Sequence, residues 1–449
     1  MIKEYEKVLD KAGLLERPAE KSEYWLKMGK KEELDKVCEK YPEVPRLIIL
    51  KQDMVKTGVM PTPRAIKALQ DPYYAHTPNL LFQYHHKDHT EGYAVPVDMR
   101  FNDGTNIRFI LGPPEMQPYT IDLIDGKFWV VCEGELLEEL NFRERPHYYG
   151  KKTRSGQPME TIIEPINGDF PLICSGRHCA FWNEGLQCRF CDMDYNTRLQ
   201  MKMGRGFTTR PSAEDVYDAM CEYLKQNRRF RHAFLTGGSD LKRDFDREYE
   251  YTLSLVDAVN RAGKDVLNEP RFPLNVIMTP LEEDLMVGLR DAGMSGAGLY
   301  IEAWPRERFE IVVPGKNKYV GFDTWIERTV NAVKIFGKGN VITEMVLCEM
   351  APAPYGVGLN GDIDEAVGIH LDGVDFFLSR DVIPIEANWF IVPGSFFYRI
   401  GAIVPPLEFF VRVGLGQFNL MKQKGDLSCI QMCYKSQCFG AYADYQRYL

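Results

Sequence analysis

The sequence lacks several features that define large classes of proteins. It has no run of about 18 apolar residues, so we expect no membrane-spanning helix. Residues 1–13 are charged and contain no apolar core of a secretory signal, which favours a cytoplasmic protein. Basic residues are not in excess, because 55 Lys and Arg stand against 64 Asp and Glu, a net charge of −9. We therefore expect neither nucleic acid nor membrane as a partner.

The sequence also lacks low-complexity linkers and internal repeats of about 20 to 50 residues. Apolar residues make up 45% and charged residues 27% of the chain, which excludes fibrous and disordered classes. Its 449 residues are enough for two or three domains, or for one large barrel with additions. The 11 cysteines are an odd number, and without a secretory signal they favour metal or iron–sulfur ligands over a disulfide framework.

Changes in the spacing of apolar residues divide the chain into four predicted segments. Residues 1–74 carry apolar residues at helical spacing. Residues 75–165 contain short strand-like runs separated by Asp-Gly dipeptides, which predict a small antiparallel β unit. Residues 166–400 alternate between strand-like and helix-like runs, and residues 401–449 form a cysteine-rich C-terminal extension.

The alternation over residues 166–400 predicts an α/β fold with a parallel sheet and right-handed crossovers. The expected strands are residues 170–174, 233–236, 274–278, 297–303, 341–347 and 382–387. The expected helices are residues 211–228, 249–263, 281–292, 324–336 and 363–371. About six β/α units make a full or partial barrel, whose ligands bind at the C-terminal ends of the strands.

Four cysteines, Cys174, Cys179, Cys188 and Cys191, lie close together after the first expected strand. Three thiolates can hold three irons of a four-iron cluster, and the open fourth iron can then bind a substrate or cofactor. A structural zinc site is the alternative, with His178 as a further ligand. Zinc ribbons usually carry a second Cys-x-x-Cys pair, and none is present nearby, so the iron–sulfur interpretation is favoured.

The cysteine segment resembles the radical S-adenosylmethionine (SAM) superfamily. Residues 188–191 read Cys-Arg-Phe-Cys, with an aromatic residue directly before the last cysteine, as in that superfamily. The upstream spacing departs from the usual three residues, because Cys179 lies eight residues before Cys188. Cys179 is preferred as the first ligand because Phe181 and its neighbours suit a loop folded over a cluster. Cys174 stays as the alternative first ligand, or as a thiol buried in the strand.

Further positions follow from this resemblance. Gly237, Gly238 and Ser239 end the second expected strand and resemble the glycine pair whose backbone contacts the amino group of SAM; an ordinary turn is the alternative. Phe190 would place a backbone group against the adenine. Glu302 would bind the ribose hydroxyls, and an ion pair with Arg306 is the alternative interpretation.

The resemblance implies a radical SAM enzyme with a 4Fe-4S cluster held by Cys179, Cys188 and Cys191. Such an enzyme reductively cleaves SAM to a deoxyadenosyl radical, which abstracts hydrogen from a small-molecule substrate, here in cofactor or metabolite biosynthesis. It implies an electron donor such as flavodoxin or ferredoxin, and anaerobic conditions. Two alternatives are radical methyl or carbon transfer to a macromolecule, and a non-catalytic iron–sulfur or zinc protein that binds partners. The sequence predicts neither the catalytic residues nor the oligomeric state.

Two further clusters of possible ligands lie outside the barrel series. Cys429, Cys433 and Cys438 resemble the ligands of auxiliary iron–sulfur clusters in radical SAM enzymes; a zinc site and plain packed thiols are the alternatives. The histidines His76, His85, His86 and His89 lie close together in the sequence. A solvated loop is the favoured interpretation for them, and a metal or substrate site is the alternative.

Overall fold

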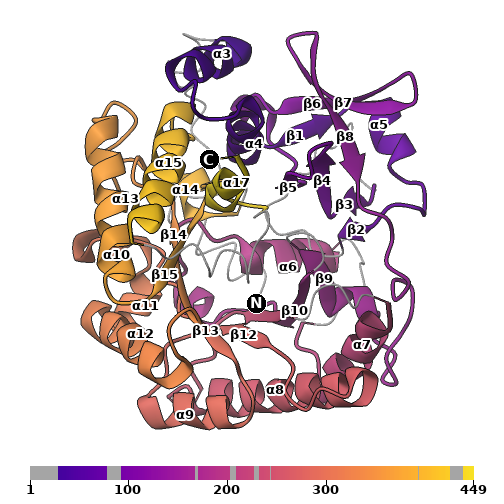
Figure 1. Cartoon of the computed structure of the whole chain (residues 1–449), viewed down its shortest axis with the longest axis vertical. Helices are drawn as coiled ribbons and strands as arrows, with labels where there is room; N and C mark the ends of the chain where they lie inside the picture. The colour runs from indigo at the N-terminus through magenta and orange to yellow at the C-terminus, as the bar shows by residue number, and fades with distance from the viewer. Residues whose placement is uncertain are drawn as a thin grey trace.

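Figure 1 shows a computed structural model of the chain. The structure describes residues 29–77, 93–166, 170–202, 209–226, 232–242, 244–392, 394–424 and 438–448. Each of its two large sheets has its own hydrophobic core. His85, His86, His89, Cys429 and Cys433 lie outside the described residues, as do residues 1–28 of the segment expected to be helical.

The larger sheet confirms the predicted series of six parallel strands. Its order is β15-β14-β13-β12-β11-β10-β9, in which β10 to β15 are parallel and β9 is antiparallel to β10. The strands are β9 (Ile163–Ile166), β10 (Phe170–Gly176), β11 (Ala233–Gly237), β12 (Leu274–Ile277), β13 (Gly296–Gly298), β14 (Val341–Val346) and β15 (Ile383–Ala387). Strands that follow one another in sequence and in space are what right-handed β/α crossovers produce.

Helices cover the outer side of the arc formed by these strands (Figure 1). They are α7 (Ala213–Gln226), α8 (Asp246–Leu267), α9 (Glu283–Asp291), α10 (Arg306–Val312), α11 (Pro314–Tyr319), α12 (Phe322–Phe336) and α13 (Ile363–Leu378). Helix α6 (Met193–Lys202) lies instead toward the centre of the molecule (Figure 1). The apolar faces of α7 to α13 pack on the strands, and the polar residues of these helices face outward. The fold is therefore an α/β open barrel, as predicted.

Strand β13 is shorter than predicted, and this changes the setting of Glu302. The sequence predicts a strand over residues 297–303, but the strand ends at Gly298. The chain then turns, and Glu302 has a left-handed backbone with φ of 70°. Leu299 and Ile301 are buried and apolar, as strand residues are. Beyond the end of β13 the chain still bridges to β14, because Glu302 N–H donates to Glu344 O at 2.7 Å and Val346 N–H donates to Glu302 O at 3.0 Å.

The smaller sheet is formed by the N-terminal part of the chain, in the order β1-β6-β7-β8-β4-β5. Its elements are α3 (Lys30–Lys40), α4 (Arg46–Thr57), β1 (Val59–Pro61), α5 (Pro63–Ala68), β4 (Asp98–Phe101), β5 (Asn106–Arg108), β6 (Tyr119–Ile124), β7 (Lys127–Cys132) and β8 (Glu135–Phe142). A two-stranded sheet, β2 (His76–Thr77) with β3 (Val95–Pro96), lies beside it. The turn at Asp125 and Gly126 joins β6 to β7 with positive φ at both residues, as this dipeptide predicts.

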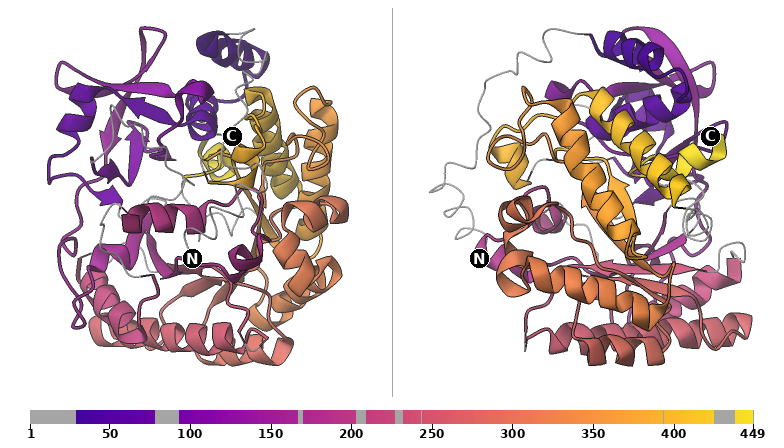
Figure 2. Two further views of the ribbon diagram at one scale, coloured as in Figure 1. Left: turned by 180° about the vertical axis from the view of Figure 1, so that it is seen from behind. Right: turned by 60° about the vertical axis from the view of Figure 1, so that its left-hand side comes forward.

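The C-terminal helices α14 (Phe396–Arg399), α15 (Leu407–Gln423) and α17 (Tyr442–Tyr448) connect the two sheets. Phe418 and Tyr445 belong to the same core as the N-terminal sheet, and Figure 2 shows α15 and α17 at that end of the molecule. The backbone N–H of Arg108 donates to Cys438 O at 3.1 Å, which ties the C-terminal segment to β5. The four-segment division stays a prediction. Among the described helices, none has the length and apolar character needed to cross a membrane.

Candidate functional site

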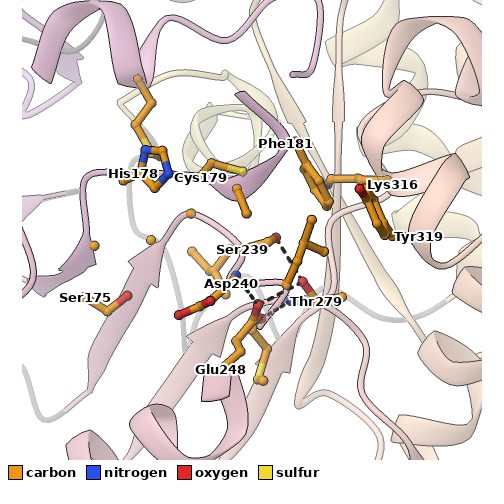
Figure 3. Close-up of a pocket in the computed structure, with 18 of the residues that line it drawn as sticks. Ser175, His178, Cys179, Phe181, Ser239, Asp240, Glu248, Thr279, Lys316 and Tyr319 are labelled. Atoms are coloured by element: carbon orange, nitrogen blue, oxygen red, sulfur yellow. Dashed lines mark hydrogen bonds between the residues drawn. The ribbon is translucent and has the colours of Figure 1, made fainter. Parts of the chain in front are cut away.

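A cavity of about 890 Å³ opens at the C-terminal ends of the parallel strands. Its lining brings together eight of the residues singled out from the sequence: Cys179, Cys188, Phe190, Cys191, Gly237, Gly238, Ser239 and Glu302. We call it the large cavity. Cys174 does not line it. Figure 3 shows side chains from the cysteine loop, from the loops after β11 and β12, and from α8 and α11 facing the same space.

The cysteine loop runs from the end of β10 to the start of α6 and is held mainly by its own backbone. A short 3₁₀ turn covers Ala180–Glu184, and Gly185 ends it with a left-handed backbone. Leu186 N–H donates to Phe181 O at 2.9 Å, and Cys191 N–H donates to Cys188 O at 3.0 Å. These bonds fix the last two cysteines relative to each other before any metal binds.

Phe181 anchors this loop to α11. Its side chain is 2% exposed, and its ring stacks on Tyr319 at 5.9 Å between centroids. The loop approaches α11 so closely that a Cβ on Gly315 would lie 2.5 Å from Phe181 Cγ. Gly315 N–H also donates to Leu186 O at 3.0 Å. Phe181, the aromatic residue expected in a loop folded over a cluster, therefore fixes the position of the cysteine loop against α11.

The glycine pair at the end of β11 lies directly against the cysteine loop. A Cβ on Gly238 would come within 2.6 Å of Cys179 Cα, and one on Gly237 within 2.8 Å of Gly176 N. Neither glycine has a positive φ, so close approach rather than backbone conformation requires glycine here. The Ala180 N–H donates to Ser239 O at 2.9 Å and completes this contact.

The three cysteines are half-buried in the wall of the large cavity, and loss of solvent around their thiols controls their ionisation. Burial raises the pKa of Cys179 to about 11 and that of Cys188 to about 12, and it raises the pKa of Cys191 well above its usual range. Bound metal reverses this preference because a coordinating thiol is deprotonated. Of the described residues, no three His, Cys, Asp or Glu converge on a point suited to a single metal ion. Ligands of a four-iron cluster bind different irons and surround a wider space. The donor set and its enclosure fit such a cluster.

Glu302 forms an ion pair, but with a different partner from the one considered from the sequence. Lys316 Nζ lies 2.9 Å from Glu302 Oε1 and donates to Tyr300 O at 2.5 Å. Arg306 pairs with Asp323 instead. Lys316 also lies 4.6 Å from the centroid of the Trp325 ring. Sequence reasoning missed Lys316, because nothing in the local pattern of α11 marks it as facing a cavity.

A second group of polar residues, Ser239, Glu248 and Thr279, lines the large cavity. Ser239 Oγ lies 2.9 Å from Thr279 Oγ1 (Figure 3). Glu248 accepts hydrogen bonds from the backbone N–H groups of Asp240 at 2.9 Å and Thr279 at 3.0 Å. Burial raises the pKa of Glu248 to about 7. This carboxyl group positions the loops after β11 and β12. Thr279 could have been found from the sequence, because it is a polar residue directly after an expected strand.

A second cavity of about 300 Å³ lies in the lumen of the barrel. We call it the lumen cavity. It is lined by residues of five parallel strands, including Cys174, and by Arg108 and Phe439 from the two ends of the chain. Gly176, Phe190 and Gly237 line both cavities, so the two spaces adjoin. Phe190 therefore stands between the cysteine loop and the lumen.

Of the other predicted ligands, Cys438 and His76 do not line the large cavity, and His178 does. Cys438 is buried, and burial raises the pKa of its thiol to about 12. The positive charge of the nearby Arg108 acts in the opposite direction and lowers this pKa. His76 interacts with Leu69 O at 2.6 Å through its ring nitrogen, and burial lowers its pKa. His178 lies at the rim of the large cavity, where its Nδ1 is 2.7 Å from Asp194 Oδ1.

An open β/α barrel with a three-cysteine loop after its first parallel strand defines the class of this protein. Comparison with known proteins finds similarity to a curated enzyme, and the radical SAM superfamily stays a resemblance found in the sequence. The curated relative is the bacteriochlorophyllide c C-7(1)-hydroxylase of Chlorobaculum limnaeum, at 23% identity over 273 residues. The match covers 60% of this chain and 64% of the relative, slightly less than two thirds of its length.

Two solved structures show a weaker likeness. Methylornithine synthase (PylB) matches at a TM-score of 0.34 and 16% identity, over 57% of this chain and 68% of its own. HydG, a maturase of the [FeFe]-hydrogenase, matches at a TM-score of 0.35 and 13% identity, over 55% and 49%. The strand order described above, rather than these scores, defines the fold. No family model matches the chain.

Proposed function

We propose that this protein is a radical SAM enzyme that cleaves SAM reductively and removes a hydrogen atom from a small-molecule substrate. One observation carries the proposal. Cys179, Cys188 and Cys191 line a single cavity with the glycines after β11 and with Glu302. These positions are far apart in the sequence, and they meet at the C-terminal ends of parallel strands, where ligands of such folds bind.

The chain's own residues have separate roles in binding. The three thiolates hold three irons of the cluster. The backbone after β11, with Gly238 and Ser239, receives the amino group of SAM, because absent side chains allow close approach. Glu302 accepts hydrogen bonds from the ribose hydroxyls, and its ion pair with Lys316 orients the carboxylate. When bound, the cluster and SAM supply one-electron cleavage of the sulfonium and a carbon radical that takes a hydrogen atom from the substrate.

We place the substrate in the lumen cavity. Phe190, Gly237 and Tyr300 line both cavities, so a molecule in the lumen adjoins one in the large cavity. The lumen is lined mainly by apolar side chains, which exclude water from reactive species. The curated relative is by its name a hydroxylase of a carbon position, which supports a C–H bond as the reacting group.

Several partners belong to the same proposal. The electron comes from a small donor protein such as flavodoxin or ferredoxin, under anaerobic conditions in the cytoplasm. Cys429, Cys433 and Cys438 hold an auxiliary cluster. The placement of Cys438 next to Arg108 and Phe439 supports this, because both of these residues line the lumen.

Anaerobic reconstitution tests the proposed function. The protein is loaded with iron and sulfide, reduced with dithionite, and supplied with SAM. We expect about four irons per occupied site and release of 5′-deoxyadenosine and methionine in equal amounts. A protein that binds zinc but no iron, or one that assembles a cluster and leaves SAM intact, contradicts the proposal and favours a non-catalytic metal protein.

A further inference from the structure

Glu344, an acidic residue in the wall of the lumen cavity, restricts the class of substrate, if the proposed function above is correct. It lies on β14 and lines the lumen together with Val346, two residues further along the strand. Side chains two residues apart in a strand point to the same face of the sheet. Glu344 lies deep inside the molecule, yet its side chain is only half-buried, so the part that stays accessible faces the lumen.

The two arginines of the lumen lining lie in other parts of its wall and contact protein groups there. Arg108, on β5, forms an ion pair with Glu164, and its guanidinium lies 6.0 Å from the centroid of the Phe439 ring. Arg177 follows β10, which β11, β12 and β13 separate from β14, and it donates to Thr161 O at 2.6 Å. The Nε atoms of both arginines are buried in the wall rather than open to the cavity.

The carboxyl group of Glu344 differs from these arginines, because no described residue forms a hydrogen bond with it. Glu160, another acidic residue of the lining, accepts a hydrogen bond from a backbone N–H at 3.1 Å. The charged groups that act on Glu344 are Glu302, Lys316 and Glu386. Lys316, the cation among them, already pairs with Glu302 at 2.9 Å. A hydrogen-bonding partner for Glu344 can therefore come from a molecule in the lumen.

A positive charge is the partner that this setting favours. Burial, with the nearby charge of Glu302, raises the pKa of Glu344 well above its usual range, so without a further cation the neutral acid is favoured. A ligand cation acts in the opposite direction, as Lys316 does. Phe190 and Tyr300 are half-buried and line the same cavity. Aromatic ring faces attract cations, and a charge-assisted hydrogen bond to a carboxylate strengthens this attraction.

We infer that the substrate is a largely apolar molecule with one cationic nitrogen, such as a primary amine, and that this nitrogen pairs with the carboxylate of Glu344. Glu344 is then a specificity-determining residue of the lumen. A ligand carboxylate at the same place would meet the negative charges of Glu302 and Glu386. The amine displaces the proton of Glu344 when it binds, so its affinity rises with pH while the amine stays charged. The volume of about 300 Å³ limits the ligand to a small molecule.

Equilibrium dialysis of the reconstituted, SAM-loaded enzyme against three probes tests this inference. The probes are 2-naphthylmethylamine, 2-naphthylmethanol and 2-naphthoate, which share one ring system and differ in charge. At pH 8 we expect the amine to bind at least about tenfold more tightly than the alcohol or the carboxylate. Glu344→Gln should weaken the amine about tenfold and the alcohol less than about twofold, because only the ionisable oxygen is lost. Between pH 6 and pH 8 the wild type should bind the amine more tightly by up to about tenfold per pH unit, and Glu344→Gln should not.

The matched control is Glu138→Gln on β8, at a half-buried carboxyl group whose pKa is also raised by burial and which lines neither cavity. It should change none of the three affinities. Equal or tighter binding of the alcohol or the carboxylate, no binding of any probe, an equal loss of amine and alcohol in Glu344→Gln, or a pH dependence that persists in this variant overturns the inference. Deoxyadenosine release without a probe is measured in parallel, with reductant. An enzyme that cleaves SAM but prefers the carboxylate removes the inference alone, and one that binds the amine as expected but leaves SAM intact removes the proposed function.

Discussion

The two adjoining cavities of this protein are built in different ways. The large cavity is made from loops at the ends of neighbouring strands, and its polar atoms are engaged in contacts such as Glu302 with Lys316 and Glu248 with Thr279. The lumen cavity is made from the strands themselves and closed by β5 and the C-terminal segment. It keeps the carboxyl group of Glu344 without a hydrogen bond to any described residue.

This difference separates two tasks. A site for a cofactor shared across a superfamily can be built from short local motifs in the β/α loops, since every member needs the same contacts. A site for a particular substrate requires side chains that the rest of the superfamily does not share. In the proposed function these come from the N-terminal sheet and the C-terminal segment, which contribute Arg108 and Phe439 to the lumen cavity. The following predictions test whether the two cavities are as distinct as their walls suggest.

The largest effect is expected from the cysteines, which differ in the cavity they line. Cys191→Ala should abolish both the iron–sulfur cluster and deoxyadenosine release, because a three-thiolate site loses one of its ligands. Cys174→Ala, in the lumen wall, should keep most of the iron. Iron content and deoxyadenosine are measured after reconstitution, with Cys221→Ala on α7 as a control thiol. If Cys174→Ala lost the cluster and Cys179→Ala kept it, the first ligand would be Cys174.

A smaller but clear loss is expected at the contact between β11 and the cysteine loop. Gly238→Ala would place a Cβ within 2.6 Å of Cys179 Cα, so the loop must move, and SAM cleavage should fall at least about tenfold. Gly176→Ala is the matched control, because a Cβ there meets no atom within 4 Å although the residue lines both cavities. Equal activities of the two variants would show that the close approach of β11 is unimportant.

Removal of the charge of Glu302 from the large cavity should weaken SAM binding and leave the fold of the protein unchanged. Glu302→Gln keeps the shape of the side chain and loses the charge-assisted acceptor, so the Kd for SAM should rise about tenfold. The affinity is measured on the reconstituted enzyme without reductant. Glu307→Gln, on the exposed face of α10, is the control and should leave the Kd unchanged. A wild-type Kd in Glu302→Gln would assign this carboxylate to the ion pair with Lys316 alone.

The smallest effect is a pH-dependent change in stability at the end of β15. Burial raises the pKa of Glu386 to about 7 from 4.5, while its carboxyl group accepts hydrogen bonds from Ala441 and Tyr442 N–H at 2.8 Å. Between these values the native state holds the proton that the unfolded chain has released. The stability from this group is therefore complete below about pH 4.5 and is lost as the pH rises through 7.

Glu386→Gln removes this dependence and keeps an oxygen acceptor for both N–H groups. Between pH 6 and pH 8 the wild type should lose about 1 kcal/mol more unfolding free energy than the variant, measured by urea denaturation. Glu43→Gln, at an exposed residue, should behave like the wild type. Parallel pH profiles for the wild type and Glu386→Gln would mean that the carboxyl group ionises normally at this end of the barrel.

The sequence predicted the parts of the fold and site that depend on local pattern. Alternating runs over residues 166–400 give the parallel strands in their observed order, and Cys188 and Cys191 fall on one loop because two residues separate them. Glu302 was found as a cavity residue, but its regular strand was predicted too long: β13 ends at Gly298, and Glu302 keeps only an isolated bridge to β14. Helix α6 was not among the expected helices, because its ten residues are mostly polar and carry a weak periodic signal.

By itself, the sequence determined the class of this protein: an open β/α barrel, a three-cysteine loop after its first parallel strand, and glycines beside that loop. These features depend on residues that lie close together in the sequence, so the spacing of residue types predicts them. Only the tertiary structure decided that Lys316 pairs with Glu302, and that Arg108, Asn388 and Phe439 enclose one lumen. More than 300 residues separate Arg108 from Phe439. Their contact follows from how two cores pack together, and no local periodicity encodes such a contact.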